Sequence, residues 1–248
     1  MMASQRSSRR GLVWAVVGGG VLLVGIVAII VASLLSRQTP GPAPSPDTTP
    51  GTSQPSTSSS SPPDVDAVVD ASVAEFGWVP EPITSDPNVY IRAALAAAST
   101  FDTTKAERPD WLSHLDSWFT PDTRYATDAD RQIELDAARL ELRQGVVLPE
   151  QEWDLLAASD GRVKADPVGD IVFVDVSDDD SGDMSIGTMD VLLTYTQDDG
   201  TGTEVEFEET VRVSVQVLCG PASVPTPNTD QRAGDCKVVR YFTEPLEP

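Results

Sequence analysis

The chain contains one histidine, His114, within a segment rich in aromatic residues, DWLSHLDSWF (110–119). A catalytic histidine needs a carboxylate that orients it and a pocket that admits a substrate. Asp110 lies one helical turn before His114 and could supply the carboxylate. However, the histidine lies beside an apolar stripe, and the nucleophile motif G-x-S-x-G does not occur in the chain. The pattern therefore favours a structural histidine in a helix that builds the core.

Two acidic segments resemble calcium loops, VSDDDSGD (176–183) and QDDGTG (197–202). An EF-hand loop needs acidic residues at positions 1, 3 and 5, glycine at position 6 and glutamate at position 12. Aligned on its glycine, the first loop has Ser177 at position 1 and the second has Tyr195. One histidine and no C-x-x-C motif also leave no ligands for a zinc site. We expect solvated turns, no metal and no cofactor.

Glu209 is the one polar residue on the apolar face of an alternating segment, TEVEFEETVRVSVQVL (203–218). An acid in that position could line a pocket and act as an acid or base. It could equally lie at a bulge or beyond the helices that cover the sheet, and this second interpretation is favoured.

The two cysteines, Cys219 and Cys236, flank the connection between the last two predicted strands. In a domain outside the membrane they most simply form one disulfide, worth about 3 kcal/mol for a loop of this size in the chain-entropy model. The alternative, two free buried thiols, would need a reducing compartment.

The N-terminal region predicts a membrane anchor. Residues 11–36 carry no charge, and as a helix they would be roughly 39 Å long at ~1.5 Å per residue, longer than the ~30 Å hydrocarbon core. A cleaved signal peptide would have a shorter apolar region, and the twin-arginine pattern SSRRGLV is equally typical of an anchored helix. Residues 1–10 carry three arginines, and only Arg37 follows the span closely, so we expect a cytoplasmic N-terminus and an extracellular C-terminal part.

Small residues recur every seven positions in this span, at Gly11, Gly18, Gly25 and Ala32. Such a stripe would let membrane helices approach closely and support a homo-oligomer, although glycine is common in membrane helices and chance recurrence is an alternative.

The exterior part is strongly acidic. The whole chain has 17 basic and 39 acidic residues, and the first 37 residues hold four of the basic ones and none of the acidic ones. A surface of this charge repels nucleic acid, so direct DNA binding is excluded as a main function.

A linker and one folded domain follow the span. Residues 37–63 include 20 Pro, Ser or Thr residues and no large apolar side chain, which predicts a disordered linker reaching up to ~80 Å at ~3.1 Å per residue. Residues 64–248 have helical periodicity first, with helices predicted near 65–76, 86–98, 111–119 and 129–144. Thr120-Pro121 is expected to stop the third of these and to cap a further short helix.

The second half of the domain changes to strand periodicity, with strands predicted at 171–176, 187–197, 203–218 and 237–242. Helices followed by an antiparallel meander predict an α+β fold with the helices on one face of a curved sheet.

The order of basic N-terminus, single span, linker and α+β domain resembles small bitopic proteins of Gram-positive conjugative elements and the Mce-associated membrane proteins. IRAALAAASTFDT (91–103) followed by DWLSHLDSWFTPDTRY (110–125) is similar to their pattern of an alanine-rich helix, Trp-Leu, a second aromatic and Thr-Pro. The resemblance implies the cone-shaped, cystatin-like fold of nuclear transport factor two and of the bitopic type IV secretion subunit. It also implies an assembly role without catalytic residues.

These observations lead to a functional expectation. We expect a non-enzymatic, membrane-anchored scaffold subunit of a transport or conjugation complex, with the membrane and proteins of that complex as partners. A ligand-binding cone is the alternative, and a cone-fold isomerase or hydratase using Glu209 or His114 is a third hypothesis.

Overall fold

The computed structural model describes residues 67–247. The predicted span and linker, with Gly11, Gly18, Gly25 and Ala32, lie outside these residues. Within residues 67–247, no helix combines the length and apolarity needed to cross a membrane. The elements follow one another as η1 (Ala71–Phe76), α2 (Pro87–Ala97), β1 (Phe101–Asp102), α3 (Arg108–Asp116), α4 (Asp128–Gly145), α5 (Glu150–Ala157), β2 (Arg162–Val174), β3 (Met184–Asp198), β4 (Glu204–Leu218) and β5 (Lys237–Phe242).

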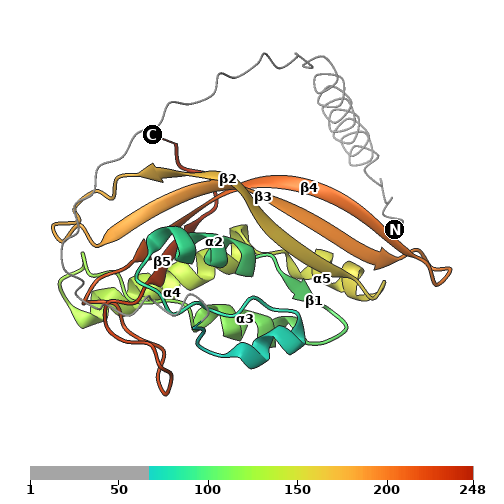
Figure 1. The fold of residues 1–248 in the computed structure, drawn as a ribbon, viewed down its shortest axis with the longest axis horizontal. Helices are drawn as coiled ribbons and strands as arrows, with labels where there is room; N and C mark the ends of the chain where they lie inside the picture. Colours follow the sequence, from blue (N-terminus) through green and yellow to red (C-terminus); the bar gives the residue numbers. More distant parts are fainter. Residues whose placement is uncertain (1–66, 248) are drawn as a thin grey trace, which may run out of the picture. The chain divides into compact units, whose positions relative to one another are not determined.

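The five strands form one antiparallel sheet in chain order, β1-β2-β3-β4-β5. Figure 1 shows the long strands β2, β3 and β4 arching over the helices, which lie on the concave side. The α+β prediction is therefore confirmed. Because neighbouring residues of a strand point to opposite faces, one side chain in two faces the helices and the other faces outward.

The core between helices and sheet is rich in aromatic rings. Trp111 of α3 and Trp153 of α5 stack with ring centroids 5.5 Å apart, and Phe101 of β1 lies 4.2 Å from Trp153. Trp118 and Tyr90 are fully buried beside them. Burial of such large apolar surfaces is the main term that holds these helices against the sheet. The segment around His114 thus builds part of the core.

The helix starts follow from local capping. The Asp86 side chain accepts a hydrogen bond from Asn88 N at 2.8 Å, and Pro87 occupies the first helical position of α2. The Thr127 side chain accepts from Asp130 N at the start of α4. Both hydrogen bonds satisfy backbone donors that a helix leaves unpaired at its start.

Several sequence predictions differ from the structure in detail. Of the helix predicted near 65–76, the described residues form only the 3-10 helix η1, Ala71–Phe76. Residues 121–127 form turns instead of a capped short helix. Helix α5 was not predicted, because its eight residues place only Trp153 and Leu156 in the core. Strand β2 begins at Arg162 instead of residue 171, and its first half has Pro167 and Gly169, which normally argue against a strand. Gly169 falls within a register shift between Val168 and Val172, and Pro167 lies where β2 is an edge strand, because β1 pairs only with Arg162 and Val163.

Candidate functional site

Strand β4 has two halves with different surroundings. Ser214–Leu218 pairs with β5 and is buried, whereas Glu204–Val213 has no strand partner on the β5 side. We call Glu204–Val213 the distal half of β4. The sheet ends there because the chain turns onto the outer face after β5: Leu246 N donates to Ser214 Oγ at 2.8 Å, and Arg212 Nε donates to Glu247 Oε1 at 2.6 Å. One edge of the distal half is therefore open.

The concave face of the distal half is apolar and exposed. Phe207 stacks on Tyr195 of β3 with ring centroids 4.6 Å apart and planes 4° from parallel. Nevertheless Phe207 is 48% exposed, and Val205 is 39% exposed. The uninterrupted β3–β4 register excludes a bulge here and keeps both residues on the same face as buried Val215 and Val217. The apolar stripe of β4 therefore continues beyond the helices that cover it.

A cavity of about 350 Å³ lies where the helix cover ends. It is bounded by the turn between α4 and α5 and by the concave face of β3 and β4, and its lining includes Val146, Leu148, Val163, Leu193, Tyr195, Glu209, Val211 and Phe242. Partial burial raises the pKa of Tyr195, and the negative charge of Glu209 adds to this shift. The cavity is mainly apolar, with an acid at its mouth.

Two charged residues line this cavity, Glu209 and Arg212. Arg212 is neutralised on the outer face by Asp190, 2.8 Å away, and by Glu247. Glu209 forms no ion pair with any residue in the part of the chain that the structure describes. Glu209 lies opposite Leu193, beyond the helices that cover the sheet. Its carboxylate could therefore bind a cation at this site.

His114 lies elsewhere, half-buried on α3. Its Nε2 is 3.0 Å from the Val79 carbonyl oxygen and 3.3 Å from Trp118 Nε1, and Trp78 stacks on its ring at 5.2 Å. Nε2 donates to Val79 when it carries hydrogen and accepts from Trp118 when it does not. Burial lowers the pKa of His114, which keeps the imidazole neutral. Within residues 67–247, the hydrogen bonds of the His114 ring go to Val79 and Trp118, and none goes to Asp110.

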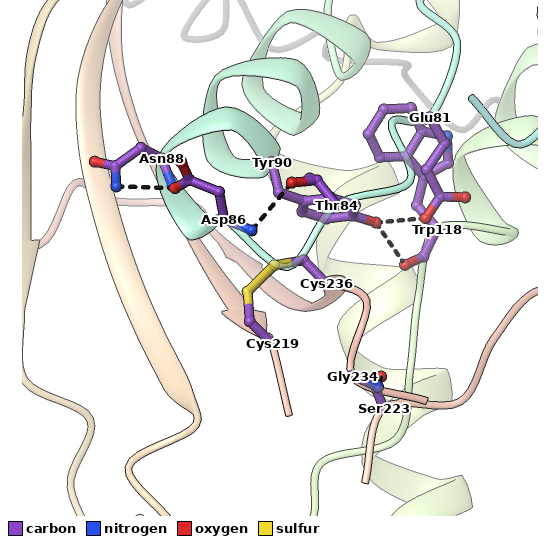
Figure 2. The surroundings of a disulfide bond; sticks show 10 residues. All are labelled: Glu81, Thr84, Asp86, Asn88, Tyr90, Trp118, Cys219, Ser223, Gly234 and Cys236. Atoms are coloured by element: carbon purple, nitrogen blue, oxygen red, sulfur yellow. Dashed lines mark hydrogen bonds between the residues drawn. A yellow bond between two sulfur atoms is a disulfide. The ribbon is translucent and has the colours of Figure 1, made fainter. Parts of the chain in front are cut away.

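A buried polar network, not visible in the sequence, joins four segments of the domain. Glu81 Oε1 accepts hydrogen bonds from Lys237 Nζ at 2.8 Å, Tyr90 Oη at 2.5 Å and Gln231 Nε2 at 3.1 Å. Glu81 is 2% and Lys237 1% exposed, and Figure 2 shows Tyr90 directed toward Glu81. Burial lowers the pKa of Lys237, while the charge of Glu81 opposes that shift. The network fixes the start of the domain to β5, and a separation of 156 residues hides it from sequence patterns.

A disulfide joins Cys219, at the end of β4, to Cys236, directly before β5, with the two sulfur atoms 2.04 Å apart (Figure 2). The backbone N of Cys236 also donates to the Thr84 carbonyl oxygen at 2.7 Å. The bridge therefore lies at the covered end of the sheet, next to the buried network.

The aspartates of the two acidic loops accept hydrogen bonds from backbone groups within or directly after the same loops. Asp179 accepts from the backbone N of Ser181 and of Met184, at 3.1 and 2.9 Å, and Asp199 accepts from Thr201 N at 2.8 Å. These hydrogen bonds shape turns. Within residues 67–247, no cluster of three or more His, Cys, Asp or Glu side chains is placed to hold a metal ion.

Comparisons with known proteins give remote structural similarities. No family model matches the chain, and no curated protein matches its sequence. An IcmL-like type IV secretion system protein from Legionella pneumophila aligns at 14% identity and a TM-score of 0.35, over 63% of this chain and 88% of that protein. CagV, a VirB8 homolog of the type IV secretion system of Helicobacter pylori, aligns at 14% identity and a TM-score of 0.33, over 62% and 93%. Similarities this remote transfer no property to the chain.

Proposed function

We propose that the protein is a non-enzymatic, single-pass membrane subunit whose exterior domain assembles with other proteins of a transport or conjugation complex. The observation that carries the proposal is the distal half of β4. It exposes Phe207 and Val205 on one face, with Phe207 stacked on the partly exposed Tyr195 of β3, and it has an unpaired backbone edge beside them. Exposed apolar surface of this kind on a soluble domain is typical of a protein interaction site. The predicted span and linker support the proposal, because they would hold such a domain outside the membrane.

The two candidate catalytic residues lie in different cavities. Glu209 lines the cavity beside β4, whereas His114 lines a different cavity of about 190 Å³ together with Val73 and Glu81. A general acid and base must reach the same substrate within hydrogen-bond distance. Residues in separate cavities cannot act as such a pair, which leaves only mechanisms that use Glu209 or His114 alone.

The second candidate function is binding of a small ligand in the cavity beside β4. Its volume and apolar lining suit a small organic molecule, and Glu209 would select one that carries a positive charge. The exposed stripe on Val205 and Phe207 favours the assembly role, because a small molecule in the cavity would leave these side chains uncovered.

Purification of the full chain from the membranes of its own cells, in mild detergent, tests the proposal. We expect a complex of defined size that contains other membrane or surface proteins in fixed ratio. A chain that elutes alone, with a co-purified small molecule, would instead support the ligand-binding function. Protease added to cells stripped of their wall should also release the domain after residue 38, and protection would contradict the exterior location.

A further inference from the structure

The distal half of β4 has the properties of an acceptor for an added strand. Its ten residues, Glu204–Val213, keep unbroken register with β3 and leave their other edge without a strand. At ~3.4 Å per residue this edge is roughly 34 Å long. Unpaired backbone groups on a long, regular edge are a template for another chain.

The opposite open edge of the sheet, on β2, is protected by several features that β4 lacks. Pro167 and the register shift between Val168 and Val172 interrupt β2, and Gly169 has a positive φ of 77°. The Gly169 carbonyl oxygen accepts from Arg92 at 2.8 Å. Proline and bulges of this kind prevent strand addition. The distal half of β4 contains neither proline nor glycine, and only its charge discourages pairing.

The two faces of the distal half specify what the added strand must carry. Glu206 and Glu208 lie on the outer face, where they form no ion pair with residues 67–247. Val205 and Phe207 lie on the concave face, and Glu209 stands at the mouth of the cavity. A strand beside β4 therefore needs basic residues on its outer face and apolar residues on its inner face. Opposite charges on adjacent strands stabilise the pair.

We infer that this edge receives an extended segment of a partner protein in which basic and apolar residues alternate, by addition of a sixth strand to the sheet. The inference rests on the proposed assembly function and assigns its site and the chemistry of its partner. Backbone hydrogen bonds would supply affinity, and the alternating side chains would supply specificity.

A second copy of this chain is a poor occupant of the same edge. Pairing two distal halves would bring the outer glutamates of one copy beside those of the other, and like charges on neighbouring strands destabilise the pair. The chain also carries a net charge of −22, so copies repel one another at low ionic strength. Charge therefore selects a basic partner.

Residue-resolved hydrogen exchange on the purified full chain in detergent tests the inference. The probe is a capped decapeptide of alternating lysine and valine, and the control peptide has the same residues at helical spacing. With the alternating peptide, we expect every second amide in 204–213 to exchange about tenfold more slowly, because only those amides face the new strand. The control peptide should produce no alternation.

Two double variants with the same change in charge separate recognition from bulk attraction. Glu206→Lys with Glu208→Lys should weaken peptide binding about tenfold or more, because the charges lie beside the added strand. Asp175→Lys with Asp180→Lys, at exposed positions before β3, should leave it unchanged. Three results would overturn the inference: equal weakening of peptide binding by both double variants, slower amide exchange without alternation, or protection of 204–213 by self-association before peptide is added.

The native complex separates this inference from the assembly function on which it rests. If the complex still forms in the Glu206→Lys and Glu208→Lys double variant, the assembly function stands and this edge is not its site. If the native protein forms no complex at all, the assembly function itself is wrong.

Discussion

The two halves of β4 share one alternating sequence pattern but differ in how far their apolar side chains are buried. In the half that pairs with β5, Val215 and Val217 are fully buried. In the distal half, the equivalent positions Val205 and Phe207 are exposed. Alternation decides which side chains share a face, whereas burial requires a neighbouring strand and a helix over that face. An apolar face that the fold leaves uncovered is available for binding.

The largest effect on the free energy of unfolding is expected from breaking the buried Glu81–Lys237 ion pair. Replacing Lys237 by Met would leave the Glu81 carboxylate buried and unpaired, and should lower the free energy of unfolding by about 3–5 kcal/mol in urea denaturation. The double variant Glu81→Gln with Lys237→Met removes both charges and should recover much of this loss. A loss below about 1 kcal/mol for Lys237→Met would show that the network is not structural.

Valine truncation compares the two halves directly. Val217→Ala should lower the free energy of unfolding by about 2 kcal/mol, because it removes buried methyl groups and leaves a cavity. Val205→Ala should change it by about 0.5 kcal/mol or less, since that side chain is already exposed to water. Equal losses would mean that the distal half is packed in the folded protein after all.

His114→Gln should cost about 1 kcal/mol near neutral pH through altered hydrogen bonds with Val79 and Trp118. The pKa of His114 in the folded protein lies below its ordinary value, so the unfolded chain binds more protons on acidification. His114 therefore lowers stability as the pH falls below about 6.5. Melting temperatures measured between pH 7.5 and 5 should depend less on pH in the Gln variant, and an unchanged pH dependence would contradict burial of a neutral imidazole.

The smallest effect on stability is expected from the exposed ion pair between Arg162 of β2 and Glu204 at the start of β4. Arg162 and Glu204 form two hydrogen bonds of 2.7 and 2.9 Å, but both side chains are largely solvated. Arg162→Gln should leave the urea midpoint nearly unchanged, because exposed ion pairs contribute little. A large shift would indicate that this contact between β2 and β4 stabilises the sheet.

The sequence predicts the parts of this molecule that depend on local patterns. The face shared by Val205, Phe207 and Val217 follows from period-two alternation, and the start of α2 follows from Asp86-Pro87. The position of Glu209 on the apolar face could also be predicted, but not whether a bulge or the end of the helix cover would explain it. That depends on where the chain turns away after β5, which is set by contacts of Leu246 and Glu247 with distant residues.

The Glu81–Lys237 pair and the first half of β2 were missed for related reasons. Neither Glu81 nor Lys237 lies in a motif, and only the assembled fold brings them together. β2 includes Pro167 and Gly169, whose local preferences oppose a strand, yet pairing with β3 imposes one. Long-range packing decides both cases.

Site-specific photocrosslinking in living cells tests most directly whether the distal half of β4 is the assembly surface. A photoreactive phenylalanine analogue would replace Phe207 in one variant and Phe173 of β2, which is similarly exposed, in the other. We predict that the Phe207 variant forms an adduct with a protein of the native complex, that the linked peptide alternates basic and apolar residues, and that Glu206→Lys with Glu208→Lys abolishes the adduct. Adducts of equal yield from both positions, or none from Phe207 while the complex remains intact, would contradict the account.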